Sequence, residues 1–242
     1  MSLNLTSAQK GTEIRFSLLL ASLIVAVVLA PLLESTRLGD LIQLSCLTLV
    51  FASAVIINWQ HRTKLSLFAA AAIVSLALHW WSFFFPNDQV SVLRYVVSFF
   101  FLGFTAALLL KSIVRRDEVT PNAILGSICV YLLLGLMWAL GYSALFFIEA
   151  SPFDLPPTAT GDALHGHPSF ATLIYFSFVT MSTLGYGDIT PQTDLARTLA
   201  WTQSVTGQFY LAVLVARLVS AMPRQERSEA TEVVEKKLTD PS

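Results

Sequence analysis

The sequence predicts an all-α polytopic membrane protein with six transmembrane helices and one re-entrant half-helix. Composition and the lengths of the apolar segments carry this prediction. Hydrophobic residues make up 55% of the 242 residues and charged residues only 13%, about half the charged share of an ordinary soluble domain. A net charge of −1 gives no basis for binding nucleic acid. The composition therefore excludes a water-soluble globule, a disordered chain and a nucleic-acid-binding module.

Six segments are long and apolar enough to cross about 30 Å of hydrocarbon, which takes a helix of about 20 residues. They are residues 16–33, 41–59, 65–85, 90–110, 123–148 and 198–216. A shorter apolar stretch, residues 168–181, cannot cross and predicts a re-entrant half-helix. The first segment also resembles a signal peptide, but Pro31 is a poor fit just after the potential cleavage site. We favour a retained helix.

The basic residues predict the orientation, because cytoplasmic loops of membrane proteins are enriched in Lys and Arg. With the N-terminus inside, the outer side receives only Arg37, Arg94 and Arg197. The cytoplasmic side receives Lys10, Arg15, Arg62, Lys64, Lys111, Arg115, Arg116, Arg217, Arg224, Arg227, Lys236 and Lys237. This asymmetry predicts six spans in the cell (inner or plasma) membrane, with both termini in the cytoplasm.

The composition changes once along the chain, at the charged stretch 111–121, which ends in the helix-breaking Pro121. We therefore divide the chain into a four-helix membrane domain (1–120), a second membrane unit (121–222) and a polar tail (223–242). Proline, glycine and aspartate predict a loop at 150–167. The tail is predicted to form at most a short helix. No internal repeat typical of many transporters is visible.

Residues 180–191 read TMSTLGYGDITP and follow the half-helix directly. In this segment Gly185 and Gly187 alternate with larger residues, and glycine permits backbone angles of alternating sign. Successive carbonyl groups can then point to one side, which no regular helix or strand allows. Four such segments around one axis would surround it with rings of oxygen atoms. Irregular backbone at membrane depth is tolerated only where it is buried or lines a cavity, so the segment predicts a path for a dehydrated cation.

The sequence TLGYGD resembles the signature of the potassium-channel pore superfamily. The resemblance covers residues 121–222, because half-helix, filter, Asp188 and a last span with Gly207 midway follow in the family's order. Leu184 stands where valine is more usual, a change behind the filter that leaves the carbonyl in place. The resemblance implies a homotetramer in which 121–222 form a pore domain of outer helix, pore helix, selectivity filter and inner helix. It is closest to the prokaryotic-type six-span plan.

The resemblance also implies roles for individual residues. The filter would consist of Thr183, Leu184, Gly185, Tyr186 and Gly187. The carbonyl groups of the first four, with the Thr183 hydroxyl, would bind K⁺, the only bound ion or cofactor expected.

Other residues would support this filter. Tyr186 would point away from the pore into an aromatic cuff that includes Tyr175 and Phe176, and Asp188 would bond behind the filter at the outer mouth. Val179 stands where some relatives have a carboxylate that pairs with this aspartate, so Asp188 needs another partner. Gly207 would be the gating hinge of the last helix.

The fourth span lacks the pattern of a voltage sensor, which needs Arg or Lys at every third position. Counting in threes from Arg94, the helix meets no second charge: the positions are Val97, Phe100, Gly103, Ala106 and Leu109. We therefore expect the first four helices to form a structural collar and the opening to depend weakly on voltage.

Three further polar features need an interpretation. His79 is either a pH sensor or metal ligand, or part of an interfacial aromatic belt with its neighbours Trp80 and Trp81, which we favour. His165 and His167 form an outer-loop pair that binds zinc or protons, or is simply solvated, which we favour. The polar midsection of the last span is interpreted as a face that lines water. It comprises Gln203, Ser204, Thr206 and Gln208.

The function predicted from the sequence is a potassium-selective channel that conducts passively as a homotetramer in the lipid bilayer. A non-selective monovalent cation channel is the first alternative, although Tyr186 and both glycines argue against it. A transporter subunit is the second, but such proteins place an acid or base at the membrane midplane. No metal-ligand cluster, phosphate loop or catalytic triad supports an enzyme.

Overall fold

The computed structural model describes residues 7–29, 37–58, 65–85, 87–114, 121–156 and 168–239, and it is mostly helical. The helices are α1 (Ser7–Ile24), continued by the π-helical turn η1 (Val25–Leu29), α3 (Arg37–Asn58), α4 (Leu65–Phe84), α5 (Asp88–Val114), α6 (Pro121–Ile148), α7 (Phe170–Met181) and α8 (Asp194–Thr239). Two short strands, β1 (Phe153–Asp154) and β2 (Thr190–Pro191), complete the fold. The predicted helical class is confirmed.

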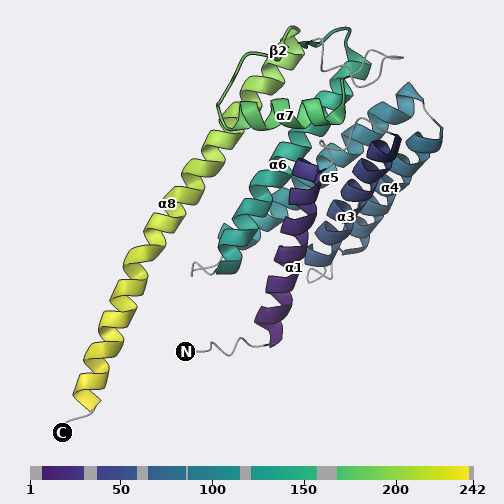
Figure 1. The fold of residues 1–242 in the computed structure, drawn as a ribbon. Helices are drawn as coiled ribbons and strands as arrows, with labels where there is room; N and C mark the ends of the chain where they lie inside the picture. The colour runs from purple at the N-terminus through teal and green to yellow at the C-terminus, as the bar shows by residue number, and fades with distance from the viewer. Residues whose placement is uncertain are drawn as a thin grey trace.

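A helix lies over each of the six predicted spans (Figure 1). By length and composition, α5 and α6 are long and apolar enough to cross a membrane. The described parts of α1 with η1, α3 and α4 contribute shorter apolar stretches, Phe16–Val28, Leu44–Ile56 and Ala70–Ser82. Residues 30–33 and 59, at the ends of the first two predicted spans, lie outside the described residues. The number of spans stays a prediction.

Helix α6 lies between the N-terminal helices and α8 (Figure 1). It packs most extensively against α5 and also contacts α1, α7 and α8. Fully buried leucines from α5 and α6, Leu102, Leu133, Leu136 and Leu140, belong to one core that continues through Phe51 of α3. Close packing of such side chains gains van der Waals contacts, which are a main source of attraction between helices in a membrane. The contact of α5 with α6 is therefore the largest between the N-terminal helices and the rest of the described chain.

The predicted half-helix is α7, which lies across one end of the molecule between α6 and α8 (Figure 1). Ser169 caps its start, since the Ser169 hydroxyl oxygen accepts a hydrogen bond from the Thr172 amide at 3.1 Å. The helix has 12 residues, about 18 Å of axial length. It is too short to cross the hydrocarbon, as the sequence predicted.

The loop predicted at 150–167 contains strand β1 in its described part. Phe153 and Asp154 pair antiparallel with Pro191 and Thr190 of β2, respectively. This small sheet fastens the segment that follows α6 to the segment that precedes α8. His165 and His167 fall in residues 157–167, outside the described residues.

Helix α8 continues far beyond the predicted last span. It runs without interruption for 46 residues, so the prediction that the tail after Met222 forms at most a short helix is wrong. A proline inside a helix removes one backbone donor and its ring crowds the carbonyl group four residues earlier, at a cost of about 3 kcal/mol, yet the helix continues through Pro223. The residues that follow it are mostly Arg, Gln, Glu, Ala and Lys, which are strong helix formers.

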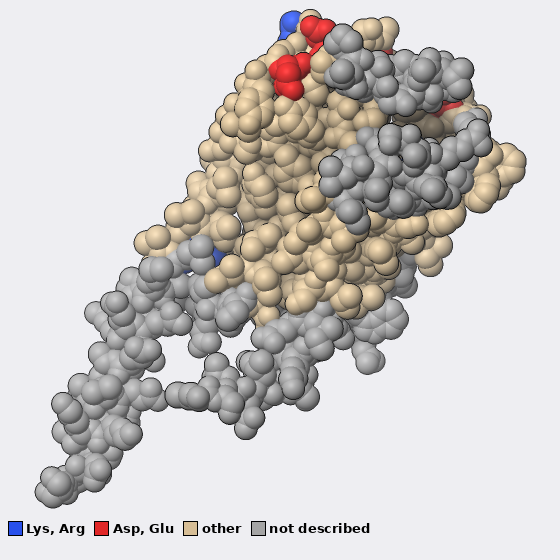
Figure 2. Space-filling view, viewed as in Figure 1, with Lys and Arg blue, Asp and Glu red and all other residues tan. Residues whose placement is uncertain are grey.

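Charge is distributed unevenly on the face drawn in Figure 2. Acidic side chains gather at the end that contains α7 and β2, where Asp188 and Asp194 are exposed. Most of the described surface below this end is uncharged (Figure 2). A wide uncharged band next to a charged end suits a protein whose sides face lipid.

Candidate functional site

The segment after α7 is fastened to the C-terminal end of that helix by backbone hydrogen bonds. The Thr183 amide donates to the Thr180 carbonyl at 3.0 Å. The amides of Leu184 and Gly185 both donate to the Val179 carbonyl, at 3.0 and 3.3 Å. The last carbonyls of a helix have no partner within the helix, and here the first residues of the motif satisfy them. The helix therefore sets where the motif begins.

The backbone of the motif alternates in conformation. Thr183, Gly185 and Gly187 have φ values of 60°, 54° and 81°, whereas Leu184 and Tyr186 between them do not have positive φ. Among the described residues, a methyl group added to either glycine would meet nothing within 4 Å. Glycine is therefore required for its backbone conformation and not for lack of space. For Thr183, a positive φ is uncommon and indicates a constrained backbone.

The motif is open on the surface of the single chain. All residues from Ser182 to Asp188 are exposed, and the Tyr186 side chain reaches 66%. The Thr183 hydroxyl donates its proton to the Ser182 carbonyl at 2.7 Å, which leaves the hydroxyl oxygen with lone pairs for a cation. The described part of the chain does not cover this backbone.

Tyr175 supplies the partner that Asp188 lacks at position 179. Its hydroxyl donates to Asp188 Oδ2 at 2.7 Å, and this hydrogen bond raises the pKa of Tyr175 to about 12. At neutral pH the phenol is protonated and can donate this hydrogen bond. Val179 acts instead through its backbone carbonyl, as described above. Tyr175 and Asp188 join α7 to the end of the motif.

The two residues of the predicted aromatic cuff, Tyr175 and Phe176, contact different parts of the structure. Phe176 is 5% exposed and lies with its ring centroid 5.0 Å from those of both Tyr142 and Phe153. It thus packs α7 against α6 and β1, whereas Tyr175 beside it is exposed and contacts Asp188. Adjacent residues on a helix point about 100° apart, so the two rings serve different neighbours.

Gly207, the predicted hinge, lies where α8 approaches α7 most closely. A Cβ atom placed there would come within 2.6 Å of both the Met181 side chain and the Met181 carbonyl oxygen. Glycine therefore allows α8 to pass the C-terminal end of α7. The helix continues through this position, and the hinge stays a prediction.

The structure contradicts one residue of the predicted water-lining face, Gln203, and the favoured interpretation of His79. Gln203 is fully buried and hydrogen-bonded to α6 and α7, so it does not line water, although Gln208 on the same helix is exposed. His79 is 3% exposed and lies edge-on to Phe51, with ring centroids 5.8 Å apart. It belongs to the packed interior and not to an interfacial belt. A polar residue in an apolar helix can face either water or a neighbouring helix, and the sequence alone does not tell which.

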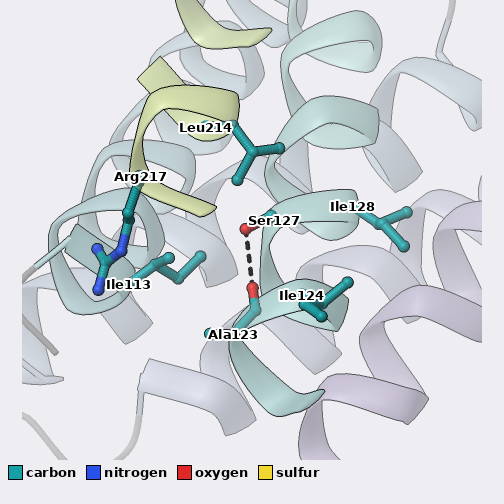
Figure 3. A pocket seen from close by; sticks show the side chains of 7 residues that line it. All are labelled: Ile113, Ala123, Ile124, Ser127, Ile128, Leu214 and Arg217. Carbon is teal, nitrogen blue, oxygen red and sulfur yellow. Dashed lines mark hydrogen bonds between the residues drawn. The ribbon is translucent and has the colours of Figure 1, made fainter. Parts of the chain in front are cut away.

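A small cavity of about 70 Å³ lies between the C-terminal end of α5, the start of α6 and the middle of α8 (Figure 3). Its lining is apolar apart from two residues, Ser127 and Arg217, and the Ser127 hydroxyl is occupied by the Ala123 carbonyl at 2.8 Å. It takes no residue from the motif. Among the described residues, no group of three or more His, Cys, Asp or Glu could hold a metal ion.

Comparison with known proteins identifies the class. A family model described as "ion channel" matches residues 137–224, which include α7, the whole motif and most of the apolar part of α8. Protein LctB from Bacillus caldotenax is 31% identical over 128 residues, covering 49% of this chain and 92% of LctB. The chain belongs to the ion-channel family.

Two plant relatives match shorter stretches. Two-pore potassium channel 4 from Arabidopsis thaliana is 45% identical over 51 residues, 21% of this chain and 18% of the relative. Two pore potassium channel c from Oryza sativa subsp. japonica is 38% identical over 66 residues, 27% of this chain and 14% of the relative. The chain thus spans less than a fifth of either plant protein. No solved structure matches the chain significantly.

Proposed function

We propose that this chain forms a homotetrameric, potassium-selective channel that conducts passively through a filter built from residues 183–187. The alternation of positive φ at Thr183, Gly185 and Gly187 carries the proposal, because it belongs to an exposed TLGYGD segment at the end of a half-helix. Membership of the ion-channel family and the two plant relatives named as potassium channels support it.

In this proposal, backbone carbonyls of residues 183–186 and the Thr183 hydroxyl replace the hydration shell of K⁺. The start of this segment is held in place before the ion arrives, because the Val179 and Thr180 carbonyl groups accept hydrogen bonds from the amides of residues 183–185. The C-terminal end of α7 carries negative partial charge. Four such ends aimed at a central cavity favour a cation there.

Four chains are required because one segment cannot enclose an ion, and the closed symmetry that fits one filter is fourfold. The exposure of residues 182–188 supports this assembly. So does α8, which leaves Trp201 and Phe209 exposed by 60% and 68%. Such large exposed apolar side chains have to be covered by lipid or by neighbouring subunits.

Gating is assigned to the last helix, with Gly207 as its hinge. Strong voltage dependence is not expected, because Arg94 is the one Arg or Lys of the sequence 88–110 and lies in the first part of α5. Both termini are placed in the cytoplasm. Conduction of this kind needs no cofactor and no catalytic residue.

The test is a reversal-potential measurement on purified protein in a planar bilayer or liposomes. With a tenfold K⁺ gradient opposed by Na⁺, a K⁺-selective pore reverses about 59 mV from zero, on the side set by K⁺. A reversal near zero would support the non-selective cation channel instead. Absence of unitary currents from correctly assembled protein would contradict any channel and favour a transporter subunit.

A further inference from the structure

Three helices meet at a buried chain of polar groups behind α7. The Tyr142 hydroxyl on α6 donates to Gln203 Oε1 on α8. Gln203 Nε2 donates to the Ser177 carbonyl at 2.9 Å and to the Ser177 hydroxyl at 2.7 Å. The Ser177 hydroxyl in turn donates to the Gly135 carbonyl on α6 at 2.7 Å. Every bond in the chain has a defined donor and acceptor.

These hydrogen bonds are costly to break because the groups that form them are buried. Tyr142, Ser177 and Gln203 are each fully buried. Loss of one partner in such a site leaves a donor or acceptor without water or protein to satisfy it, which costs more than the net value of the bond itself. An apolar residue at position 203 would pack without this requirement. The amide therefore fixes one arrangement of α6, α7 and α8 and disfavours displaced ones.

Ser177 lies two residues before Val179 on α7. The Val179 carbonyl accepts the amides of Leu184 and Gly185, so the position of α7 determines the position of the first filter carbonyls. A short path thus leads from Gln203 on α8 through Ser177 and Val179 to the filter backbone. Tyr142 strengthens the same path, because its ring also packs 5.0 Å from that of Phe176.

We propose that Gln203 is a positioning residue for ion selectivity. It touches no ion; it holds α7 against α8 and α6 and thereby sets the spacing of the filter carbonyls. The inference rests on the proposed potassium-selective function. It predicts that loss of the amide relaxes discrimination between K⁺ and Na⁺ while the channel still assembles and conducts.

The experiment compares K⁺/Na⁺ permeability ratios of full-length channels from reversal potentials. Gln203→Leu removes the amide, Ser177→Ala removes one of its two acceptors, and Tyr142→Phe removes one donor. We expect a roughly tenfold loss of the ratio for Gln203→Leu and smaller losses for the other two, given the usual effect of unmatched buried groups.

Matched controls remove similar groups elsewhere in the pore domain. Ser143→Ala deletes a buried hydroxyl that bonds only the Ala139 carbonyl of its own helix, at 2.9 Å. Tyr210→Phe deletes a buried phenol hydroxyl that bonds the Ser127 carbonyl at 2.5 Å, away from Ser177. Both controls should keep the wild-type ratio and assemble normally.

Three results would overturn the inference. One is a wild-type ratio in Gln203→Leu and Ser177→Ala channels that assemble normally. Another is equal loss in the two controls, which indicates general loosening. The third applies if Gln203→Leu fails to assemble: Ser177→Ala and Tyr142→Phe then provide the test, and unchanged permeability ratios in both would overturn the inference.

A wild-type channel that does not select K⁺ would instead refute the proposed function. Failure of the inference and failure of the proposed function are therefore distinct results.

Discussion

Gly187 is a residue where a single methyl group is expected to abolish conduction. Its φ of 81° is in the left-handed region, while the space around it in one chain is open. Gly187→Ala should therefore cost about 1–2 kcal/mol in each subunit through backbone strain alone. We expect K⁺ flux into liposomes to be lost while membrane insertion and assembly persist. Normal flux and selectivity in this variant would refute the assignment of Gly187 to the filter.

Tyr175 is expected to protect the conducting filter through Asp188. Tyr175→Phe removes the 2.7 Å hydrogen bond to this carboxylate and keeps the ring. A loss of about 1 kcal/mol corresponds to about fivefold, so current during sustained conduction should decay about fivefold faster. Tyr95→Phe on α5 is the control and should decay like wild type. Equal decay rates in all three channels would mean that Tyr175 does not support the filter.

Local requirements made part of the site predictable from the sequence. Positive φ at Gly185 and Gly187 follows from glycine in an alternating motif, and the half-helix α7 follows from the short apolar run 168–181. The partners of Asp188 and Gln203 were missed. Tyr175 is 13 positions from Asp188 and Tyr142 is 61 from Gln203, and no local pattern indicates such pairs.

Among the elements, α8 and α7 are predicted to pack too closely at Gly207 to accept a side chain there. Gly207→Ala places a methyl group against the Met181 carbonyl oxygen, which cannot move aside as a side chain can. Overpacking of this kind costs about 1–3 kcal/mol, so the thermal unfolding temperature should fall.

Gly103→Ala is the matched control for this substitution. Its added methyl group would meet only the Met137 side chain, at 2.9 Å from the sulfur, and methionine adapts readily. It should lower the unfolding temperature less. An unchanged unfolding temperature in Gly207→Ala, together with altered channel opening, would contradict the packing role. Gly207 would then act only as a hinge of α8.

The elements themselves were largely predictable, because apolar length identifies helices well. Where prediction failed, the sequence pattern had two physical meanings. The polar tail consists largely of strong helix formers, which predict a helix, but it lacks the apolar face that predicts a packed one. Helix propensity is the better guide here, because α8 extends to Thr239. His79 lies next to two tryptophans, a pattern typical of an interface, yet α3 covers it with Phe51.

For the whole molecule, assembly is the first prediction. The purified protein in detergent should have the mass of four chains, because the exposed motif of one chain cannot enclose an ion. Mass photometry or cross-linking provides the measurement, with denatured protein as the monomer standard. A conducting monomer or dimer would contradict the proposed arrangement.

Voltage dependence is the second prediction for the whole molecule. One charge that crosses the full field yields about 2.3 kcal/mol per 100 mV. Arg94 lies near the start of α5, with its guanidinium 4.3 Å from the centroid of the Tyr95 ring, so its displacement would cover only part of the field. Conductance should vary weakly with potential, and Arg94→Gln should leave the curve unchanged. A steep sigmoid curve would contradict the collar interpretation of the first four helices.

The uninterrupted length of α8 makes it a lever with unequal arms about Gly207. Of its residues, 13 precede this position (194–206) and 32 follow it (208–239), or about 20 Å and 48 Å at 1.5 Å per residue. A rigid tilt at this point would displace the far end about two and a half times as much as the near end. Small movements beside α7 would thus become large ones at the C-terminal end, and a force applied there would act on the pore with the same mechanical advantage.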